Sequence, residues 1–111
     1  MPFDALPSGL VTDAIMLKIA RDGIATGWAQ GQFGLRDEKK HCLIGWLLEA
    51  ADWDTAEACR LAIDYVYPSL PAKSKKLSPL QSIWQYNDLG SGEAGKRRVL
   101  KLMDDAISLA V

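Results

Sequence analysis

Apolar residues recur at the spacing of an α-helix through most of the chain, and no segment alternates apolar and polar residues as a half-buried strand does. Residues that cap helices divide this pattern: Ser8 precedes the first helix, and Ser78 followed by Pro79 opens the fourth. The predicted helices span residues 8–22, 39–52, 54–67, 78–87 and 93–110. This order predicts an all-α fold, a compact bundle of four main helices with one short helix at 78–87.

Two of these helices differ in how their apolar residues are arranged. In the first helix, Val11, Ile15 and Ile19 form a series four residues apart. The helix predicted over 39–52 is apolar on nearly every side, which is typical of a helix at the centre of a fold.

A cap and a charged stripe define the helix predicted from residue 54. Asp54 and Glu57 have the spacing of a capping box. The helix should end before Pro68, because proline lacks the amide that a helix interior needs. Glu57, Arg60 and Asp64 lie three and four residues apart, so we expect ion pairs on the exposed face of this helix.

The segment between the first two helices is rich in glycine. Four glycines fall between residues 23 and 34, and neither a helix nor a strand tolerates that density. They match neither the phosphate-binding P-loop nor the dinucleotide fingerprint. We therefore expect an ordered loop, with a small strand pair at most, which Trp28 and Phe33 anchor to the body of the protein.

Length and composition fit a single helical domain over residues 1–111. A chain of this length can bury roughly two thirds of its unfolded surface in one core, so it needs neither a metal nor a disulfide for stability. No apolar run approaches the length of a membrane span, and the first residues lack the basic flank of a signal peptide. We therefore expect a cytoplasmic protein that does not associate with a membrane.

The chain offers few groups for covalent or metal chemistry. Cys42 and Cys59 show no paired spacing, and we expect both thiols to be free and buried. His41 is adjacent to Cys42, but neighbouring residues on a helix point about 100° apart and cannot act as base and nucleophile. One histidine and two separate cysteines do not make a zinc site. The sequence therefore predicts no catalytic residue, no metal and no cofactor, and it favours a protein that is not an enzyme.

The chain contains four tryptophans, which supply either core volume or binding surface. Helical spacing places Trp46 and Trp84 in the core. Trp53 stands between two aspartates at a helix junction, so we expect it to be partly exposed and to pack across the turn.

Charge is unevenly distributed, although the whole chain carries only −1. Residues 1–72 hold 6 basic and 10 acidic groups, and residues 73–111 hold 7 basic and 4 acidic groups, so the two parts carry −4 and +3. The basic residues of the second part are either a solvated face or one partner-binding patch. They are Lys73, Lys75, Lys76, Lys96, Arg97, Arg98 and Lys101.

Three short motifs follow one another along residues 10–110: Gly27-Trp28, Cys42-Leu43-Ile44-Gly45 and Asn87-Asp88. Their order resembles that of a family of uncharacterised small bacterial proteins, common in actinobacteria and mobile elements. Its members have a Gly-Trp segment, a Cys-Leu-x-Gly-Ala-Leu helix and a Trp-Asn-Asp turn. Trp46 stands where that family has alanine, and Tyr86 where it has tryptophan. The resemblance implies a shared architecture and no particular reaction.

These observations favour a non-enzymatic binding or regulatory domain that recognises a macromolecular partner, a protein in preference to a nucleic acid. A small accessory or inhibitor protein of a phage or mobile element fits this class, and self-association is compatible with it. The alternative is a small-ligand protein or an enzyme, with a pocket between the glycine-rich loop and a turn at Asn87. The candidate residues of that pocket are Trp28, Gln30, Asn87 and Asp88.

Overall fold

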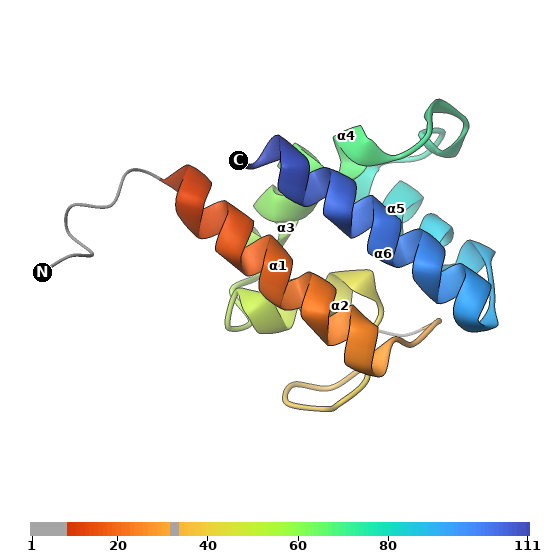
Figure 1. Ribbon diagram of the computed structural model, residues 1–111, viewed down its shortest axis with the longest axis horizontal. Coiled ribbons are helices and arrows are strands. Elements are labelled where there is room, and N and C mark those ends of the chain that lie inside the picture. The colour runs from red at the N-terminus through yellow and green to blue at the C-terminus, as the bar shows by residue number, and fades with distance from the viewer. Residues whose placement is uncertain (1–8, 32–33) are drawn as a thin grey trace, which may run out of the picture.

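In the computed structural model, which describes residues 9–31 and 34–111, the described chain consists of helices and connecting loops without a strand. Two long helices, α1 (Gly9–Gly27) and α6 (Gly92–Leu109), lie side by side and run in opposite directions (Figure 1). The other α-helices are α2 (Leu43–Ala50), α3 (Thr55–Leu61), α4 (Tyr67–Ser69) and α5 (Pro79–Leu89). The all-α prediction is confirmed. The glycine-rich loop was expected to hold a small strand pair at most. In the described residues one isolated parallel bridge, between Trp28 and His41, is present.

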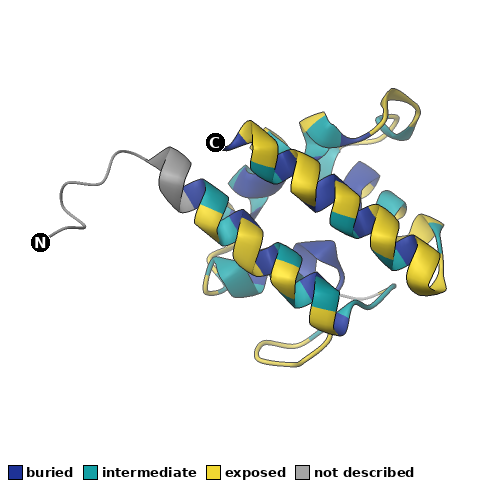
Figure 2. Ribbon diagram, in the orientation of Figure 1, coloured by how far each residue is buried: buried dark blue, intermediate teal, exposed yellow. Residues whose placement is uncertain are grey.

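One cluster of buried apolar side chains joins the main helices. The buried residues of these helices are coloured dark blue in Figure 2. Each of these helices contributes a side chain with no exposed surface: Leu17, Leu43, Leu61, Ile83 and Met103 come from α1, α2, α3, α5 and α6. Every residue of α2 from Leu43 to Leu48 except Trp46 is buried. The prediction that this apolar helix lies at the centre is therefore confirmed.

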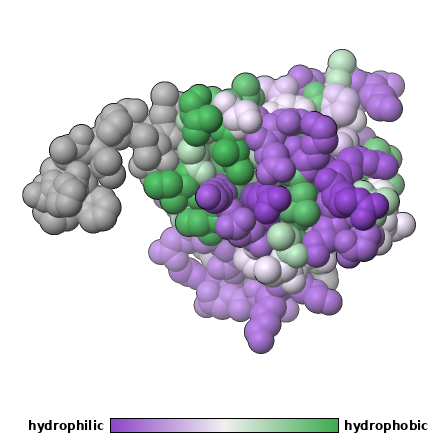
Figure 3. All heavy atoms as spheres, viewed as in Figure 1, coloured by the Kyte–Doolittle hydropathy of each residue, from purple (hydrophilic) through white to green (hydrophobic). Residues whose placement is uncertain are grey.

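The residues that α1 buries are not those of the apolar series identified in the sequence. The structure buries Asp13, Leu17 and Ile24, whereas Ile15 and Ile19 are 53% and 51% exposed. Figure 3 accordingly shows hydrophobic residues gathered over the first half of α1. The buried series has the spacing of one helix face, and it can contain an aspartate because that aspartate has partners on α3 and in the turn after it.

The helix α1 continues through Gly23 to Gly27, so the prediction that it ends at residue 22 is wrong. Gly23 lies against the ring of Trp46, and a Cβ atom at Gly23 would stand 2.3 Å from Trp46 Cε3. The indole Nε1 of Trp46 also donates a hydrogen bond to the carbonyl oxygen of Gly27, at 2.8 Å. Glycine at position 23 therefore allows α1 and α2 to approach closely, rather than ending a helix.

We expect Gly23→Ala to lower the free energy of unfolding by about 1–3 kcal/mol, because the added methyl group overlaps the Trp46 ring. Urea denaturation of the two proteins measures this cost. In a Trp46→Leu background the same substitution should cost less, because the ring is no longer present. An equal cost in both backgrounds would show that the close approach to Trp46 is not the cause.

The described part of the loop after α1 covers residues 28–31 and 34–42. The helix α2 begins at Leu43, so the prediction that it begins near residue 39 is wrong at this end. Cys42 instead occupies the N-cap position, in an extended conformation. Two further expectations, the N-cap at Ser8 and the anchoring role of Phe33, lie outside the described residues.

The helix that begins after Asp54 does not end before Pro68, contrary to the prediction. Residues 62–66 form a π-helical turn, and the chain then continues as α4 through Pro68 to Ser69. Pro68 stands in the first turn of α4, where a missing amide is tolerated. The predicted cap is confirmed, since the Asp54 side chain accepts a hydrogen bond from the Glu57 amide at 3.1 Å.

The helix α5 runs two residues beyond its predicted end. Asn87 and Asp88 therefore lie in the last turn of a helix, not in the loop that follows it. Ser78 occupies the N-cap position as predicted, although its side chain makes no capping hydrogen bond. The prediction that Trp84 lies in the core is wrong, because it is on the exposed side of α5. Trp53 is partly buried, as expected.

Candidate functional site

The four residues predicted to line a pocket lie together where the loop after α1 crosses α5. Asn87, in the centre, is 1% exposed. Its Oδ1 accepts hydrogen bonds from Trp28 Nε1 at 2.8 Å and from the Leu43 amide at 3.0 Å. Its Nδ2 donates to the carbonyl oxygen of Ala29 at 3.1 Å and to Asp88 Oδ1 at 3.0 Å. One side chain thus joins α5 to the loop and to the start of α2.

Two more side chains complete this group, which we call the Asn87 cluster (Trp28, Gln30, Asn87 and Asp88). Asp88 Oδ1 accepts a hydrogen bond from the Gly31 amide at 3.0 Å. Gln30 Nε2 donates to the carbonyl oxygens of Asn87, at 3.2 Å, and of Gly90. A carboxamide can accept two hydrogen bonds and donate two, and Asn87 makes all four. Its polar atoms are therefore already occupied within the protein.

A hollow of about 420 Å³ adjoins the Asn87 cluster. It is lined by Thr26, Gly27, Trp28, Lys40, Gly92, Glu93 and Lys96. Trp28 is the one predicted pocket residue that lines it, and its indole N–H is bound to Asn87. The charged groups of the hollow are two lysines and one glutamate, an arrangement that was not predicted from the sequence.

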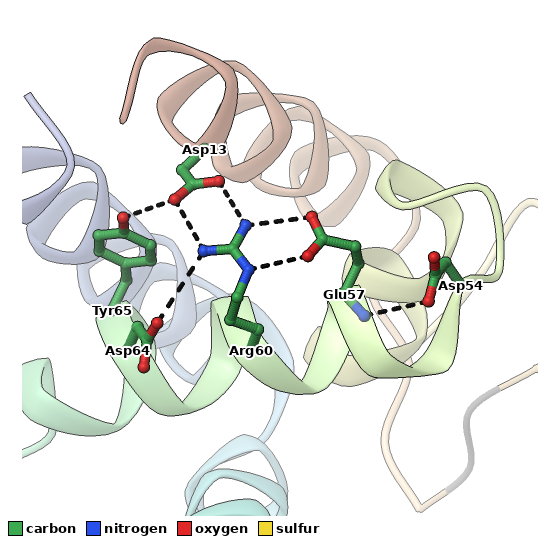
Figure 4. A network of polar contacts seen from close by, with 6 residues as sticks. All are labelled: Asp13, Asp54, Glu57, Arg60, Asp64 and Tyr65. Atoms are coloured by element: carbon green, nitrogen blue, oxygen red, sulfur yellow. Dashed lines mark hydrogen bonds and ion pairs between the residues drawn. The ribbon is translucent and has the colours of Figure 1, made fainter. Parts of the chain in front are cut away.

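A second polar group, the Asp13 network (Asp13, Glu57, Arg60, Asp64 and Tyr65), joins α1 to α3 and the π-helical turn (Figure 4). Arg60 donates from Nη1 and Nη2 to the two oxygens of Asp13, at 2.9 and 2.6 Å. It also donates to both oxygens of Glu57, at 2.8 and 3.1 Å, and lies 3.9 Å from Asp64. Tyr65 donates its hydroxyl to Asp13 Oδ2 at 2.6 Å. The predicted ion pairs along α3 are confirmed.

The charges of the Asp13 network stabilise one another. Hydrogen bonds from Arg60 hold the pKa of the Asp13 carboxyl below its ordinary value, although burial acts in the opposite direction. The hydrogen bond to Asp13 raises the pKa of the Tyr65 hydroxyl, and Asp13 and then Glu57 raise that of Arg60. The network is therefore a structural contact between helices and not an acid and base pair. The link of this network to α1 was not predicted from the sequence, where its one signal was a single acid, Asp13, four residues before Leu17.

Cys42 and His41 do not form a catalytic pair. Cys42 is buried, and its sulfur accepts a hydrogen bond from the Gly45 amide at 3.5 Å. Burial raises the pKa of the Cys42 thiol, which disfavours the reactive thiolate. His41 precedes α2, and its Nε2 faces Glu49 Oε2 at 3.1 Å while its ring meets that of Trp46 edge-on. The expectation of buried thiols is confirmed for Cys42, whereas Cys59 is half-buried.

We expect Cys42→Ala to lower the free energy of unfolding by about 1 kcal/mol and to leave partner binding unchanged. The substitution removes a weak cap and a small apolar side chain but no reactive group. Thermal denaturation and the binding assay described below measure the two effects, with Cys59→Ala as the matched control. Loss of binding by a folded Cys42→Ala protein would contradict this assignment.

The seven basic residues proposed as one patch are separated in the structure. Lys96 and Arg98 are two positions apart, about 200° around α6, and Lys96 lines the hollow beside Trp28. Lys101 forms an ion pair with Asp105, at 3.2 Å. Lys96 and Arg98 therefore point to different sides of α6, and the charge of Lys101 is paired.

Lys75 interacts with residues close to it in the chain, whereas Lys73 and Lys76 line hollows beside α5 and α6. The Nζ of Lys75 donates to the carbonyl oxygen of Pro68 at 3.1 Å and lies 5.6 Å from the centre of the Tyr67 ring. Lys73, Lys76 and Arg98 line two adjoining hollows of about 250 and 450 Å³. We call the two together the Tyr86 groove, lined by Pro71, Lys73, Ser74, Lys76, Gln85, Tyr86, Leu89 and Arg98.

The Tyr86 groove has a distinct chemical character. None of its lining residues is acidic, and three are cationic. Burial raises the pKa of the Tyr86 hydroxyl, with Arg98 and Lys101 acting in the opposite direction, so the group is protonated at neutral pH. Its surface therefore offers hydrogen-bond donors and positive charge.

Among the described residues, no three His, Cys, Asp or Glu side chains are grouped so as to hold a metal ion. None of the described helices combines the length and the apolar character needed to cross a membrane.

Comparison with known proteins gives no relative: no family model, no curated protein and no solved structure matches this chain.

Proposed function

We propose that this chain is a non-enzymatic binding domain that recognises a macromolecular partner, a protein rather than a nucleic acid, through the basic residues of its last part. An accessory or inhibitor protein of a phage or mobile element is the kind of protein that this proposal includes. Membership of the bacterial family that its motifs resemble is part of the same proposal.

The observation that carries the proposal is a difference in how the arginines are paired. Arg21, Arg36 and Arg60, in the first part of the chain, each form an ion pair with an aspartate. Within the described residues, Arg97 and Arg98 form no ion pair with a carboxylate. Their charges are therefore free to attract an acidic partner.

The charge of the rest of the chain favours a protein as that partner. Residues 1–72 carry −4, so a long polyanion that extends beyond the basic residues meets repulsion. A protein can confine its acidic residues to the area of contact, and oppositely charged surfaces accelerate such association.

Binding to three polyanions tests the proposal: polyglutamate, single-stranded RNA and duplex DNA, each titrated at about 50 and about 200 mM salt. We expect polyglutamate to bind at the lower salt concentration and to dissociate at the higher one, and neither nucleic acid to bind. Reversal of the two unpaired arginines of α6 should weaken binding, and reversal of two exposed lysines on α1 and in the loop after it should not. The variants are R97E/R98E and the control K18E/K39E.

Two results would contradict the proposal. If polyglutamate fails to bind at the lower salt concentration, the basic residues are a solvated face. If RNA or DNA binds more tightly than polyglutamate, with a steep dependence on salt, the partner is a nucleic acid.

The alternative function, a small-ligand protein or enzyme with its pocket at the glycine-rich loop, has less support. The polar atoms of Asn87 bind other parts of the protein. Cys42 is a buried cap. What remains for a ligand is the hollow beside Trp28, whose charged groups are not arranged as nucleophile and base.

A further inference from the structure

We propose that the Tyr86 groove binds an acidic segment of the partner protein that inserts one aliphatic side chain beside Leu89. This inference rests on the proposed function and makes it more specific, because it names the chemistry of the segment and the place where it binds. Two independent properties of the groove support it, its charge and its exposed leucine.

The charge of the groove comes from residues that the chain itself does not neutralise. Lys73 and Lys76 lie on the connection before α5, and Arg98 lies on α6, so three segments of chain meet around Tyr86. In the described residues none of these three cations forms an ion pair. The Tyr86 hydroxyl and the Arg98 guanidinium are both donors that a carboxylate can accept from.

The second property is an apolar side chain in the same place. Leu89 lines both hollows of the groove and is 61% exposed. It lines the groove together with Tyr86, which packs against the core, and Pro71 also lines one of the hollows. An aliphatic side chain inserted there would remove Leu89 and itself from water, a favourable contact that carboxylates alone cannot make.

The same pair of properties favours a protein segment over RNA. Single-stranded nucleic acid binds to grooves that combine several cations with aromatic rings on which bases stack. The one aromatic ring in this groove, Tyr86, is partly buried against the core, and a leucine, Leu89, is exposed beside it. Leucine has no flat surface for a base, but it matches an aliphatic side chain.

Nuclear magnetic resonance of the full, isotope-labelled chain tests this inference and detects weak binding. The probes are two short peptides of glutamate and aspartate, identical except for a central leucine in one and serine in the other. We expect the leucine peptide to bind about tenfold more tightly, because it buries one more aliphatic side chain. The shifted amides should belong to residues 72–76, 85–89 and 98.

Variants assign the two contributions to particular side chains. Leu89→Ser should remove the difference between the peptides, whereas Leu109→Ser, at an exposed leucine on the last turn of α6, should preserve it. The double variant K73E/R98E should weaken both peptides. K18E/K39E, which changes the charge equally at exposed residues elsewhere, should weaken neither by more than about twofold.

The outcomes separate this inference from the proposed function. Equal binding of the two peptides, unchanged in Leu89→Ser, would overturn the inference while leaving an acidic partner in place. Failure of both peptides to shift any resonance of the groove would also overturn it, and polyglutamate binding would then decide the proposed function separately. A single-stranded RNA that shifts the same resonances at lower concentration than either peptide would overturn both.

Discussion

Replacing Asn87 by alanine is expected to lower the free energy of unfolding by about 3–5 kcal/mol, a large share of the stability of a domain this size. The substitution leaves three polar groups without their partner: the indole N–H of Trp28, the amide of Leu43 and the carbonyl of Ala29. Each such group that remains buried costs about 1–3 kcal/mol, and local rearrangement recovers part of this.

Urea denaturation followed by circular dichroism measures this effect. Gln85→Ala is the matched control, since it removes a carboxamide from the same helix at an exposed position. Asn87→Asp should also destabilise the protein, because it places an oxygen opposite the Ala29 carbonyl and the Asp88 carboxylate. If Asn87→Ala unfolds at the same urea concentration as Gln85→Ala, the Asn87 cluster does not stabilise the fold.

Replacing Arg60 by methionine should lower the free energy of unfolding by about 2–3 kcal/mol at pH 7. It leaves the carboxylate of Asp13, which is 3% exposed, with the Tyr65 hydroxyl as its remaining partner in the network. The expected cost is below that of a fully buried pair because Arg60 itself is partly exposed and solvent screens it. Arg21→Met, which breaks an exposed pair with Asp104, should cost well under about 1 kcal/mol.

The cost of Arg60→Met should depend on pH in a defined direction. Because Arg60 lowers the pKa of Asp13 in the folded protein, this contribution is complete above the unfolded value of about 3.9 and is lost as pH falls through the folded value. In the variant, burial without the arginine favours the protonated acid, so acid should stabilise that site. Urea midpoints measured from pH 7 down to about pH 3 should therefore converge. A constant difference over this range would exclude Asp13 as the source of the effect.

Local sequence signals predicted the helices well because each depends on residues close together in the chain. The apolar stretch from Leu43, the cap at Asp54 and the ion pairs of Glu57 with Arg60 all follow from spacings of a few residues. The error at the end of the first helix occurred because a distant residue changes the meaning of a local one. From the sequence alone, Gly23 indicates the end of a helix. In the structure Trp46 packs against Gly23 and the helix continues.

The candidate sites were less predictable for the same reason. Trp28 and Asn87 are 59 residues apart, and nothing in the sequence shows that their side chains satisfy each other and leave no polar atom of Asn87 for a ligand. The charge of the last part of the chain was visible in the sequence. The distribution of this charge around α6 was not visible in the sequence, because the directions in which Lys96 and Arg98 point depend on which face of the helix is buried.

The hydrogen bonds of the Asn87 cluster also determine how local motion in this protein is coupled. The Gly31 amide lies on an exposed loop, yet it donates to Asp88 of α5. Its exchange with deuterium should therefore be slower than that of a loop amide without a partner. The Leu43 amide, which is bound to the buried Asn87 side chain, should exchange only when α5 opens. The loop after α1 and the helix α5 then open as one cooperative unit, although more than fifty residues separate them in the chain.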